Sequence, residues 1–570
     1  MRARLLAAFS LAFAAACQAQ EHEHPAGEKL GTVQFATSCN EPAQKDVNRA
    51  VALLHSFQFS RAIEGFQLAL IEDPTCGISY WGIALSDWSN PFAPGMKDKG
   101  QLQAGQKSVE RGKTVGSKTE RERAYLAAVS KLYLNYETTP QPERLAAYRD
   151  TMHAVASKYP DDHEAQIFYA LSIAASVDPA DKTYAGRLAA GDILEKLFEQ
   201  EPSHPGLAHY IIHTYDVPSL APRALVAARR YSEIAPDAPH ALHMPSHTFT
   251  RTGYWQESID TNNAAAAAAR REGQTAEELH ASDYEVYAYL QTGQDQAALR
   301  IVNSLPDIAS RFDPTSVLNG AGGPSVGYFA LAAIPARYAL ERRDWKQAAQ
   351  LSVRETPFPH TDAITWFARG LGAARSEQAP VVLDSAKALK RIRERLLAAG
   401  ENYWALQVQI QQLAVLAWAA LADGKREEAL LQMRAAAELE DGTEKSAVTP
   451  GPLAPARELL GEMLLETHQP AQALAEFEAT LKREPRRFHA LYGAAHAAQL
   501  SGDREASRRY FQELLRVCVR ADSPGRPELM EADSQVASNG VPESYGPPTN
   551  IPSFIEAVPG ANALWLSNGL

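Results

Sequence analysis

Two pairs of histidines have the residue type and the spacing to bind a metal ion. His209 and His213 form the first pair, and His243 and His247 follow 34 residues later. Within each pair the spacing is i, i+4, so both imidazoles can share one face of a helix. Imidazole nitrogens are suitable ligands for zinc, copper, nickel and non-haem iron. The pattern therefore indicates a histidine-lined surface and a candidate metal site.

Further candidate ligands align with these pairs. Gly253 and Gly293 mark equivalent turns, and this shift of 40 residues places His280 opposite His240 and Asp283 opposite His243. Asp216 is expected to orient one of the rings or to interact with its own helix end. The full set of expected metal ligands is His209, His213, His240, His243, His247, His280 and Asp283.

A second interpretation of the histidines stays open. They also fit a polar network of hydrogen-bonding side chains, rings packed between helices, or contacts to the carboxylates of a bound peptide, because no closed metal motif is present. Pro245 lies inside the second pair and lacks a backbone donor, so it is expected to kink the helix or to begin it. His22 and His24 fit an accessory metal contact or a flexible polar terminus.

The elements that carry these histidines are predicted to be repeated helical hairpins. An interval of 34 residues is the length of one tetratricopeptide repeat. The clearest copy runs from Leu453 to Pro485 and has Gly461, Ala473 and Phe477 in the order of that pattern. We therefore predict an all-α, tetratricopeptide-repeat-like (TPR-like) solenoid over residues 42–520.

Three segments depart from the repeat. Residues 20–41 form an N-terminal segment, and residues 90–161 are expected to be an irregular helical insertion, with a capping box between Ser117 and Glu120. Residues 521–570 are a tail rich in Pro, Gly, Ser and Asn. Its aromatic residues, such as Phe554 and Trp565, suggest that it lies against the body of the protein.

The N-terminus is typical of an export signal. Arg2 and Arg4 precede a short apolar stretch that ends in small residues before Cys17, so residues 1–19 are predicted to be a signal peptide or a lipoprotein signal. Lipidation of Cys17 and simple cleavage nearby are equally compatible with this pattern. Either way, we expect the protein to be exported to the periplasm or cell envelope.

Export changes how the remaining cysteines are interpreted. Cys39 and Cys76 are 37 residues apart, close to one repeat length, and each precedes a helix-like segment. Successive repeats place equivalent helix starts side by side, so a disulfide between them is expected in an oxidising compartment. Cys518 is expected to be a buried or free thiol.

Composition excludes some classes of function. The chain has 570 residues, a formal net charge of -12 and a hydrophobic fraction of 45%. An acidic chain argues against nucleic-acid binding as the main function, because phosphate backbones attract basic surfaces. No later segment has an uninterrupted apolar run of spanning length, so membrane contact is expected only through a lipid anchor.

Four segments resemble a bacterial family of exported tetratricopeptide proteins. They are Phe35-Ala-Thr-Ser-Cys39, Tyr80-Trp-Gly82, His209-Tyr-Ile-Ile-His213-Thr-Tyr-Asp216 and Pro239-His-Ala-Leu-His243-Met-Pro-Ser-His247. The histidine segments are the specific part. The resemblance implies the fold and export, and it implies that first helices line a concave groove. It transfers no activity.

Two functions follow as hypotheses. In the first, the protein is an exported TPR scaffold that binds a protein or peptide in its concave groove, because stacked first helices form a long continuous surface. In the second, the histidine cluster binds a divalent transition metal such as zinc, copper or iron, and a metal-bound water or a redox metal performs chemistry. The residues do not determine whether the protein is an enzyme.

Overall fold

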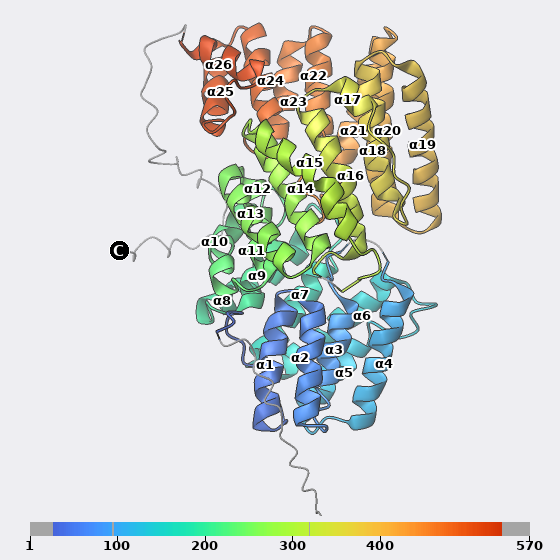
Figure 1. Cartoon of the computed structure of the whole chain (residues 1–570), viewed down its shortest axis with the longest axis vertical. Helices are drawn as coiled ribbons and strands as arrows, with labels where there is room; N and C mark the ends of the chain where they lie inside the picture. The colour runs from blue at the N-terminus through green and yellow to red at the C-terminus, as the bar shows by residue number, and fades with distance from the viewer. Residues whose placement is uncertain (1–26, 94–95, 319, 538–570) are drawn as a thin grey trace, which may run out of the picture.

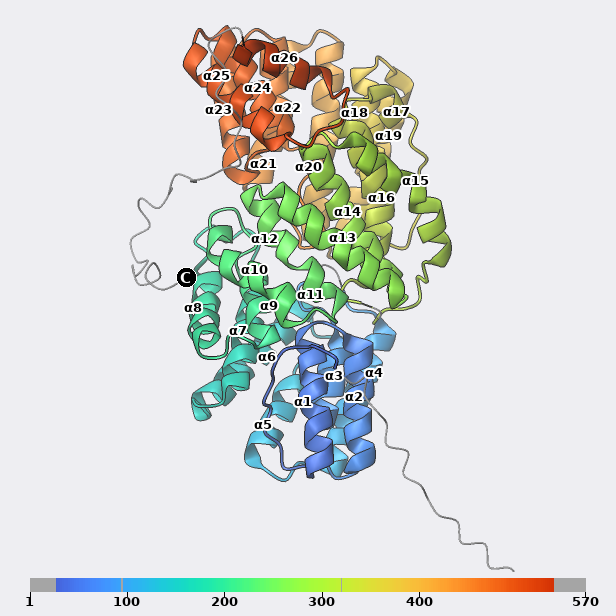
Figure 2. The same ribbon diagram turned by 60° about the vertical axis from the view of Figure 1, so that its left-hand side comes forward.

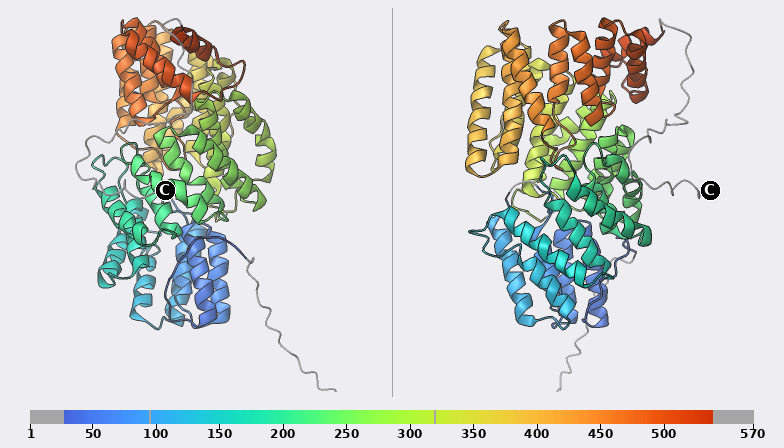
Figure 3. Two further views of the ribbon diagram at one scale, coloured as in Figure 1. Left: turned by 90° about the vertical axis from the view of Figure 1, so that its left-hand side faces the viewer. Right: turned by 180° about the vertical axis from the view of Figure 1, so that it is seen from behind.

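The protein is a stack of helices. The computed structural model describes residues 27–93, 96–318 and 320–537, and in these ranges every regular element is helical. Sequence neighbours pack as hairpins, with α1–α6 at one end of the molecule, α9–α14 in the middle and α18–α26 at the other end (Figures 1, 2 and 3). The prediction of an all-α, TPR-like solenoid is confirmed.

The helices have the following bounds. The first part comprises α1 (Glu41–His55), α2 (Phe59–Glu72), α3 (Ser79–Trp88), α4 (Lys99–Val115), α5 (Glu120–Ser130), α6 (Gln141–Lys158), α7 (His163–Ala175) and α8 (Ala185–Gln200). The middle comprises α9 (Pro205–Thr214), η1 (Ala221–Ala224), α10 (Leu225–Ile234), α11 (Pro239–His243), α12 (Pro245–Thr252), α13 (Trp255–Arg271), α14 (Thr275–Gln291), α15 (Asp295–Arg311) and α16 (Gly323–Glu341). The last part comprises α17 (Trp345–Ala349), α18 (Pro359–Arg375), α19 (Ala379–Ala398), α20 (Asn402–Ala422), α21 (Arg426–Asp441), α22 (Ala456–Glu466), α23 (Pro470–Arg483), α24 (Phe488–Leu500), α25 (Arg504–Val517) and α26 (Pro527–Ala537).

Small residues let aromatic rings fill the space between successive helices. Gly461 and Gly493 both lie against the Phe477 ring, and an added Cβ would lie 2.9 Å from that ring at Gly461 and 2.3 Å from it at Gly493. Phe66 packs against Gly82 in the same way near the N-terminus. The same fit between glycine and phenylalanine therefore occurs near both ends of the stack, since close packing needs volume complementarity.

The region expected to be an irregular insertion consists of regular helices. α4, α5 and α6 pack on one another and on α3 and α7, so they continue the stack. The capping box forms between Thr119 and Glu122, not between Ser117 and Glu120 as predicted, because α5 begins at Glu120. Both pairs fit the same sequence pattern, and only the position of the first helical turn distinguishes them.

A disulfide stabilises the N-terminal end of the stack, and an additional helix packs on its C-terminal end. At the N-terminal end, a disulfide joins Cys39 to Cys76 with a Cα–Cα distance of 5.0 Å, which links the start of α1 to the turn before α3. At the C-terminal end, α26 packs on α25, so part of the expected tail belongs to the stack. The signal with Cys17, the histidines at 22 and 24, and residues 538–570 lie outside the described residues.

One described helix has the length and hydropathy of a membrane span. It is α20, and 44% of its most apolar 18-residue window is buried inside the protein. It packs between α19 and α21 in the stack, and a core helix can have the same composition.

Candidate metal centre

Six of the seven expected ligands converge in the middle of the stack. His209 and His213 lie on α9, His240 and His243 on α11, His247 on α12 and His280 on α14. Pro245 occupies the first turn of α12, where its missing donor costs nothing, and Met244 keeps helical backbone angles between α11 and α12. The chain therefore stays helical through Pro245, and His243 and His247 share one face.

The histidines are buried, which corrects the expectation of an open groove. Their relative exposures lie between 0 and 6%. Segments from distant parts of the chain cover them, namely residues near Phe92, Ala321 and Val448. The site is therefore an internal cluster between helices, and the concave surface does not present these rings to a large partner.

The six rings form two groups of three. The first trihistidine group is His209, His213 and His240, and the second trihistidine group is His243, His247 and His280. In each group one nitrogen per ring lies within 4.8 Å of the others. Nitrogens bound to one tetrahedral metal are about 3.3 Å apart, since metal–nitrogen bonds are about 2.0–2.1 Å. Small movements of the rings would bring either group to that spacing.

The groups adjoin each other. The ring centroids of His240 and His243 are 5.8 Å apart, and those of His213 and His247 are 5.7 Å apart. Each group draws on more than one element, so the packing of the α9, α11, α12 and α14 helices fixes both. The arrangement is a pair of neighbouring three-nitrogen sites.

The seventh expected ligand, Asp283, is not part of the cluster. Its carboxylate pairs with Arg337, with Oδ1 2.7 Å from Nε. Tyr284 takes the place next to the histidines, 4.8 Å from His243 and 4.9 Å from His247 between ring centroids. On a helix, residues i and i+4 share a face, so Tyr284 is the residue that lies beside His280.

Hydrogen bonds fix the tautomers in the first trihistidine group. His209 Nδ1 lies 2.6 Å from the carbonyl oxygen of His55, which only accepts, so this nitrogen carries the proton. His240 Nδ1 donates to Glu277 Oε1 at 2.7 Å. Burial alone would raise the pKa of Glu277, but the interaction with His240 lowers it to about 2, so Glu277 is a carboxylate. Both rings therefore turn an unprotonated Nε2 inward.

The second trihistidine group is oriented in the same way. Asn262 donates its Nδ2 to the Ser258 carbonyl at 2.7 Å, which leaves its Oδ1 to accept from His243 Nδ1 at 2.7 Å. His247 Nδ1 donates to Asp216 Oδ2 at 3.0 Å. Such bonds from the outer nitrogen to a carbonyl or carboxylate are the usual support of metal-binding histidines.

Five of the inward nitrogens meet no hydrogen-bond donor among the described residues. In the first group the Nε2 atoms of His209, His213 and His240 are buried without a hydrogen bond. In the second group His243 Nε2 and His247 Nε2 face each other at 3.1 Å although both outer nitrogens already hold the proton. Buried polar atoms normally have a partner, and two lone pairs this close repel. A cation between the rings would give the unpaired nitrogens a partner and would remove the repulsion between the facing lone pairs.

The electrostatics keep the histidines in the form that binds metals. Burial lowers the pKa of His209, His213 and His243 well below the ordinary value of an imidazole. Burial also lowers the pKa of His247 to about 4 and that of His280 to about 3. These five rings are therefore neutral at neutral pH, and a neutral imidazole is the metal ligand.

Asp216 connects the second trihistidine group to the rest of the protein. Its Oδ1 accepts from Arg251 Nε at 3.0 Å, and its Oδ2 accepts from Lys445 Nζ at 3.0 Å and from His247. Although burial alone would raise its pKa, Lys445 and Arg251 hold the pKa of Asp216 well below its usual range. Asp216 thus orients the His247 ring, which is one of the two roles that the sequence suggested for it.

A third group of possible ligands, His55, Glu164 and His204, forms hydrogen bonds within itself. Glu164 accepts from His55 Nε2 at 2.9 Å and from His204 Nε2 at 3.0 Å, and the two histidines keep its pKa well below normal despite burial. His55 Nδ1 then accepts from the hydroxyl of Tyr210 at 3.0 Å. This group fixes the His55 carbonyl and, through it, the orientation of His209.

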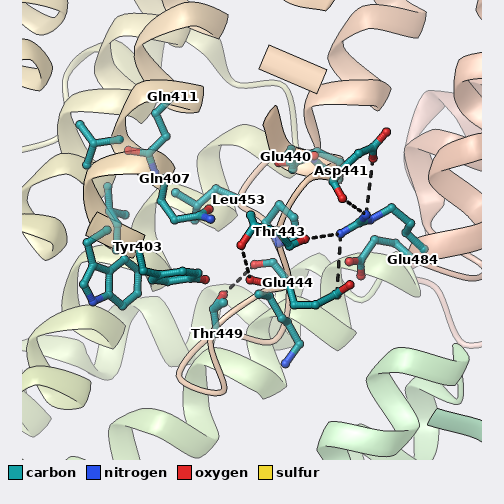
Figure 4. A pocket seen from close by; sticks show the side chains of 18 of the residues that line it. Tyr403, Gln407, Gln411, Glu440, Asp441, Thr443, Glu444, Thr449, Leu453 and Glu484 are labelled. Carbon is teal, nitrogen blue, oxygen red and sulfur yellow. Dashed lines mark hydrogen bonds and ion pairs between the residues drawn. The ribbon is translucent and has the colours of Figure 1, made fainter. Parts of the chain in front are cut away.

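A separate pocket adjoins the second trihistidine group. Its walls include Tyr403, Gln407 and Gln411 of α20 on one side and Glu440, Asp441 and Glu444 on the other (Figure 4). Lys445 and Arg251 also line this pocket, and both bind Asp216. The Asp216 carboxylate therefore lies between the pocket and His247.

The sequence did not identify several residues that support the histidines. His55, His204, Glu164 and Asn262 carry no spacing that marks them, because they come from distant or differently aligned helices. Glu277 precedes His280 by one helical turn, which was the available signal for it.

Comparisons with known proteins give no family. No protein-family model matches the chain, and no curated protein matches it. Among solved structures, a human IFIT1 dimer with PPP-AAAA is similar at 12% identity and a TM-score of 0.38, over 85% of this chain and 98% of that chain. An APC/C hetero-tetramer of Cut9-Hcn1 is similar at 13% identity and a TM-score of 0.34, over 87% and 89% of the two chains. These similarities carry no argument about the function of this chain.

Proposed function

We propose that this protein binds two transition-metal ions, one in each trihistidine group. The observation that supports this most strongly concerns four of the six rings, His209, His240, His243 and His247. The outer nitrogen of each is fixed as a hydrogen-bond donor, and the inner nitrogen of each meets no donor. A merely structural histidine cluster would use the inner nitrogens in hydrogen bonds.

The ligand set selects the kind of metal. Three imidazoles without a carboxylate suit zinc, copper, iron or nickel, whereas magnesium and calcium prefer oxygen. Three protein ligands also leave one position of a tetrahedral ion free, as in metal sites that bind a further small ligand. The protein's own residues hold, orient and bury the ions.

The test is the metal content of protein purified without an affinity tag. After chelation and reloading with copper, zinc or iron, we expect two ions per chain. The His209→Ala/His240→Ala variant and the His243→Ala/His280→Ala variant should each keep one. His153→Ala, which removes an exposed histidine elsewhere, should keep two. Circular dichroism checks that each variant is folded, and wild-type protein that binds none of the three metals contradicts the proposal.

Peptide binding is the second candidate function. The TPR-like fold supports a scaffold role, and one observation favours the pocket beside α20 as the binding site. The Oε1 atom of Gln411 is buried there without a hydrogen bond, and Tyr403 and Trp404 lie on the same wall. An amide oxygen beside aromatic rings fits a peptide N–H group.

Fluorescence polarisation with a panel of labelled unstructured peptides tests this second candidate. Peptides that bind wild-type protein should lose affinity in the Gln411→Leu variant, which keeps the size of the side chain but removes the acceptor. Equal affinities in both proteins would exclude this pocket.

We also propose that the protein works outside the cytoplasm, in the periplasm or cell envelope. The disulfide between Cys39 and Cys76 supports an oxidising compartment. The mass of the intact protein tests this proposal, because export predicts loss of the signal, with or without a lipid on Cys17. Retention of residues 1–19 together with reduced cysteines would contradict it.

A further inference from the structure

A small cavity lies between the two trihistidine groups. Two histidines of each group line it, His213 and His240 from the first and His247 and His280 from the second. Its volume is about 20 Å³. A single water needs roughly 10–15 Å³ of such space, so the cavity fits a molecule of about two atoms. A ligand there would face both metal positions at once.

The wall opposite the histidines is apolar. It includes Phe92, Ala93, Val326, Ala447 and Val448 among the described residues. The ring of Phe92 stacks on His213 with centroids 4.2 Å apart. This surface would exclude larger polar molecules from the space between the metals.

No lysine or arginine lines the cavity among the described residues, and the side-chain amide of Asn90 in that wall already makes two hydrogen bonds. Asn90 donates its Nδ2 to the carbonyl oxygen of Ala321 at 3.0 Å and accepts from the amide of Phe92 at 2.8 Å. Tyr284, which lies beside the second group, has carbonyl oxygens of Ala447 and Thr449 at 3.1 and 3.2 Å from its hydroxyl. Anions such as phosphate or carboxylate bind where donors converge, so this cavity favours a neutral ligand.

We propose that the cavity binds dioxygen between two copper ions, one in each trihistidine group. This inference rests on the proposed metal-binding function and adds the ligand. Of the metals that imidazoles suit, zinc has no redox chemistry, whereas copper can supply an electron. Each copper(I) ion transfers one electron to dioxygen, which becomes bound peroxide with its O–O bond intact. Release of dioxygen returns both electrons to the copper ions.

Oxygen uptake by copper(I)-loaded protein tests the proposal. The protein is loaded without oxygen, its copper content is measured, and dioxygen is then added while an electrode follows its consumption. We expect one dioxygen for every two copper ions and a new absorption band. Carbon monoxide, a neutral diatomic ligand of copper(I), is the second probe and requires no electron transfer; it should also bind.

A variant that fills the cavity locates the binding site. Val448→Phe should keep both copper ions but take up dioxygen and carbon monoxide at least tenfold more weakly. The same substitution at the exposed Val519 is the matched control and should behave like wild type. Wild-type protein with two copper ions that binds neither gas would overturn this inference and leave metal binding standing. Unchanged uptake by Val448→Phe would also overturn it, and failure to bind copper would overturn both proposals.

Discussion

Replacing Glu277 with glutamine is expected to weaken metal binding in the first trihistidine group alone. The Glu277 carboxylate accepts from His240 Nδ1 at 2.7 Å and from the amide of Ala321 at 3.1 Å. A glutamine amide has only one oxygen. If that oxygen faces Ala321, the NH₂ group meets His240 Nδ1 and moves the ring proton to Nε2, where it blocks the metal. If the oxygen faces His240, the NH₂ group meets the amide of Ala321.

The expected loss follows from the role of Glu277 as an orienting acceptor. Removing such a partner of a metal-binding histidine lowers affinity about 10- to 100-fold. This corresponds to about 1.4–2.7 kcal/mol. The second trihistidine group should be unaffected, because its orienting acceptors are Asn262 and Asp216.

Titration against a competing chelator measures the two dissociation constants separately. The matched control is Glu278→Gln, which alters the next residue of α14. Glu278 is equally buried, but it pairs with Arg270 and Arg311. The reasoning is refuted if Glu277→Gln leaves both constants unchanged, or if Glu278→Gln weakens binding as much.

Three further predictions concern stability. Burial raises the pKa of Glu285 to about 8, so the free energy of unfolding is unaffected by this group below pH 4.5 and falls as the pH rises from 4.5 to 8. Glu285→Gln removes the titrating group, so it should stabilise the protein by about 3 kcal/mol at pH 7 and leave its stability unchanged at pH 4. Urea unfolding at both pH values measures this difference. Replacing Cys39 and Cys76 by serine should cost about 4 kcal/mol, because the closed loop spans 37 residues, and an unchanged melting temperature would contradict this. Gly493→Ala places a methyl group 2.3 Å from the Phe477 ring, so it should destabilise the protein by about 1–3 kcal/mol while the metal content stays the same; calorimetry with metal analysis checks both.

The fold could be predicted because its signals are local. The glycine, alanine and phenylalanine positions of one hairpin recur in the next, so packing within a repeat is encoded in a short stretch of sequence. The exact start of a helix is less well encoded: two overlapping capping patterns fit the sequence before α5 equally well, and the one predicted, Ser117 with Glu120, is not the one that forms.

The site could be predicted in part for the same reason. The 34-residue interval identified His209, His213, His243 and His247, and the shift of 40 added His240 and His280. The alignment was wrong for Asp283. One residue along a helix turns a side chain by about 100°, and the residue on the histidine face is Tyr284, beside His280. The same alignment paired His280 with His240, whereas the packing of α14 groups it with His243 and His247.

The supporting hydrogen bonds depend on contacts between distant segments. His209 is oriented by the carbonyl of His55, 154 residues away. Burial of the cluster likewise depends on segments near Phe92 and Val448. Such contacts leave no periodic pattern in the sequence, so the internal position of the site could only come from the structure.

X-ray absorption spectroscopy of the metal-loaded protein tests the central claim most directly. The account predicts three imidazole ligands per ion, with metal–nitrogen distances of about 2.0–2.1 Å, and a second metal near each ion in the protein with both groups intact. The His243→Ala/His280→Ala variant should keep the imidazole ligands of the remaining ion and lose the signal of the second metal. Oxygen-dominated ligation without imidazole, or a spectrum identical in wild type and variant, would contradict the account.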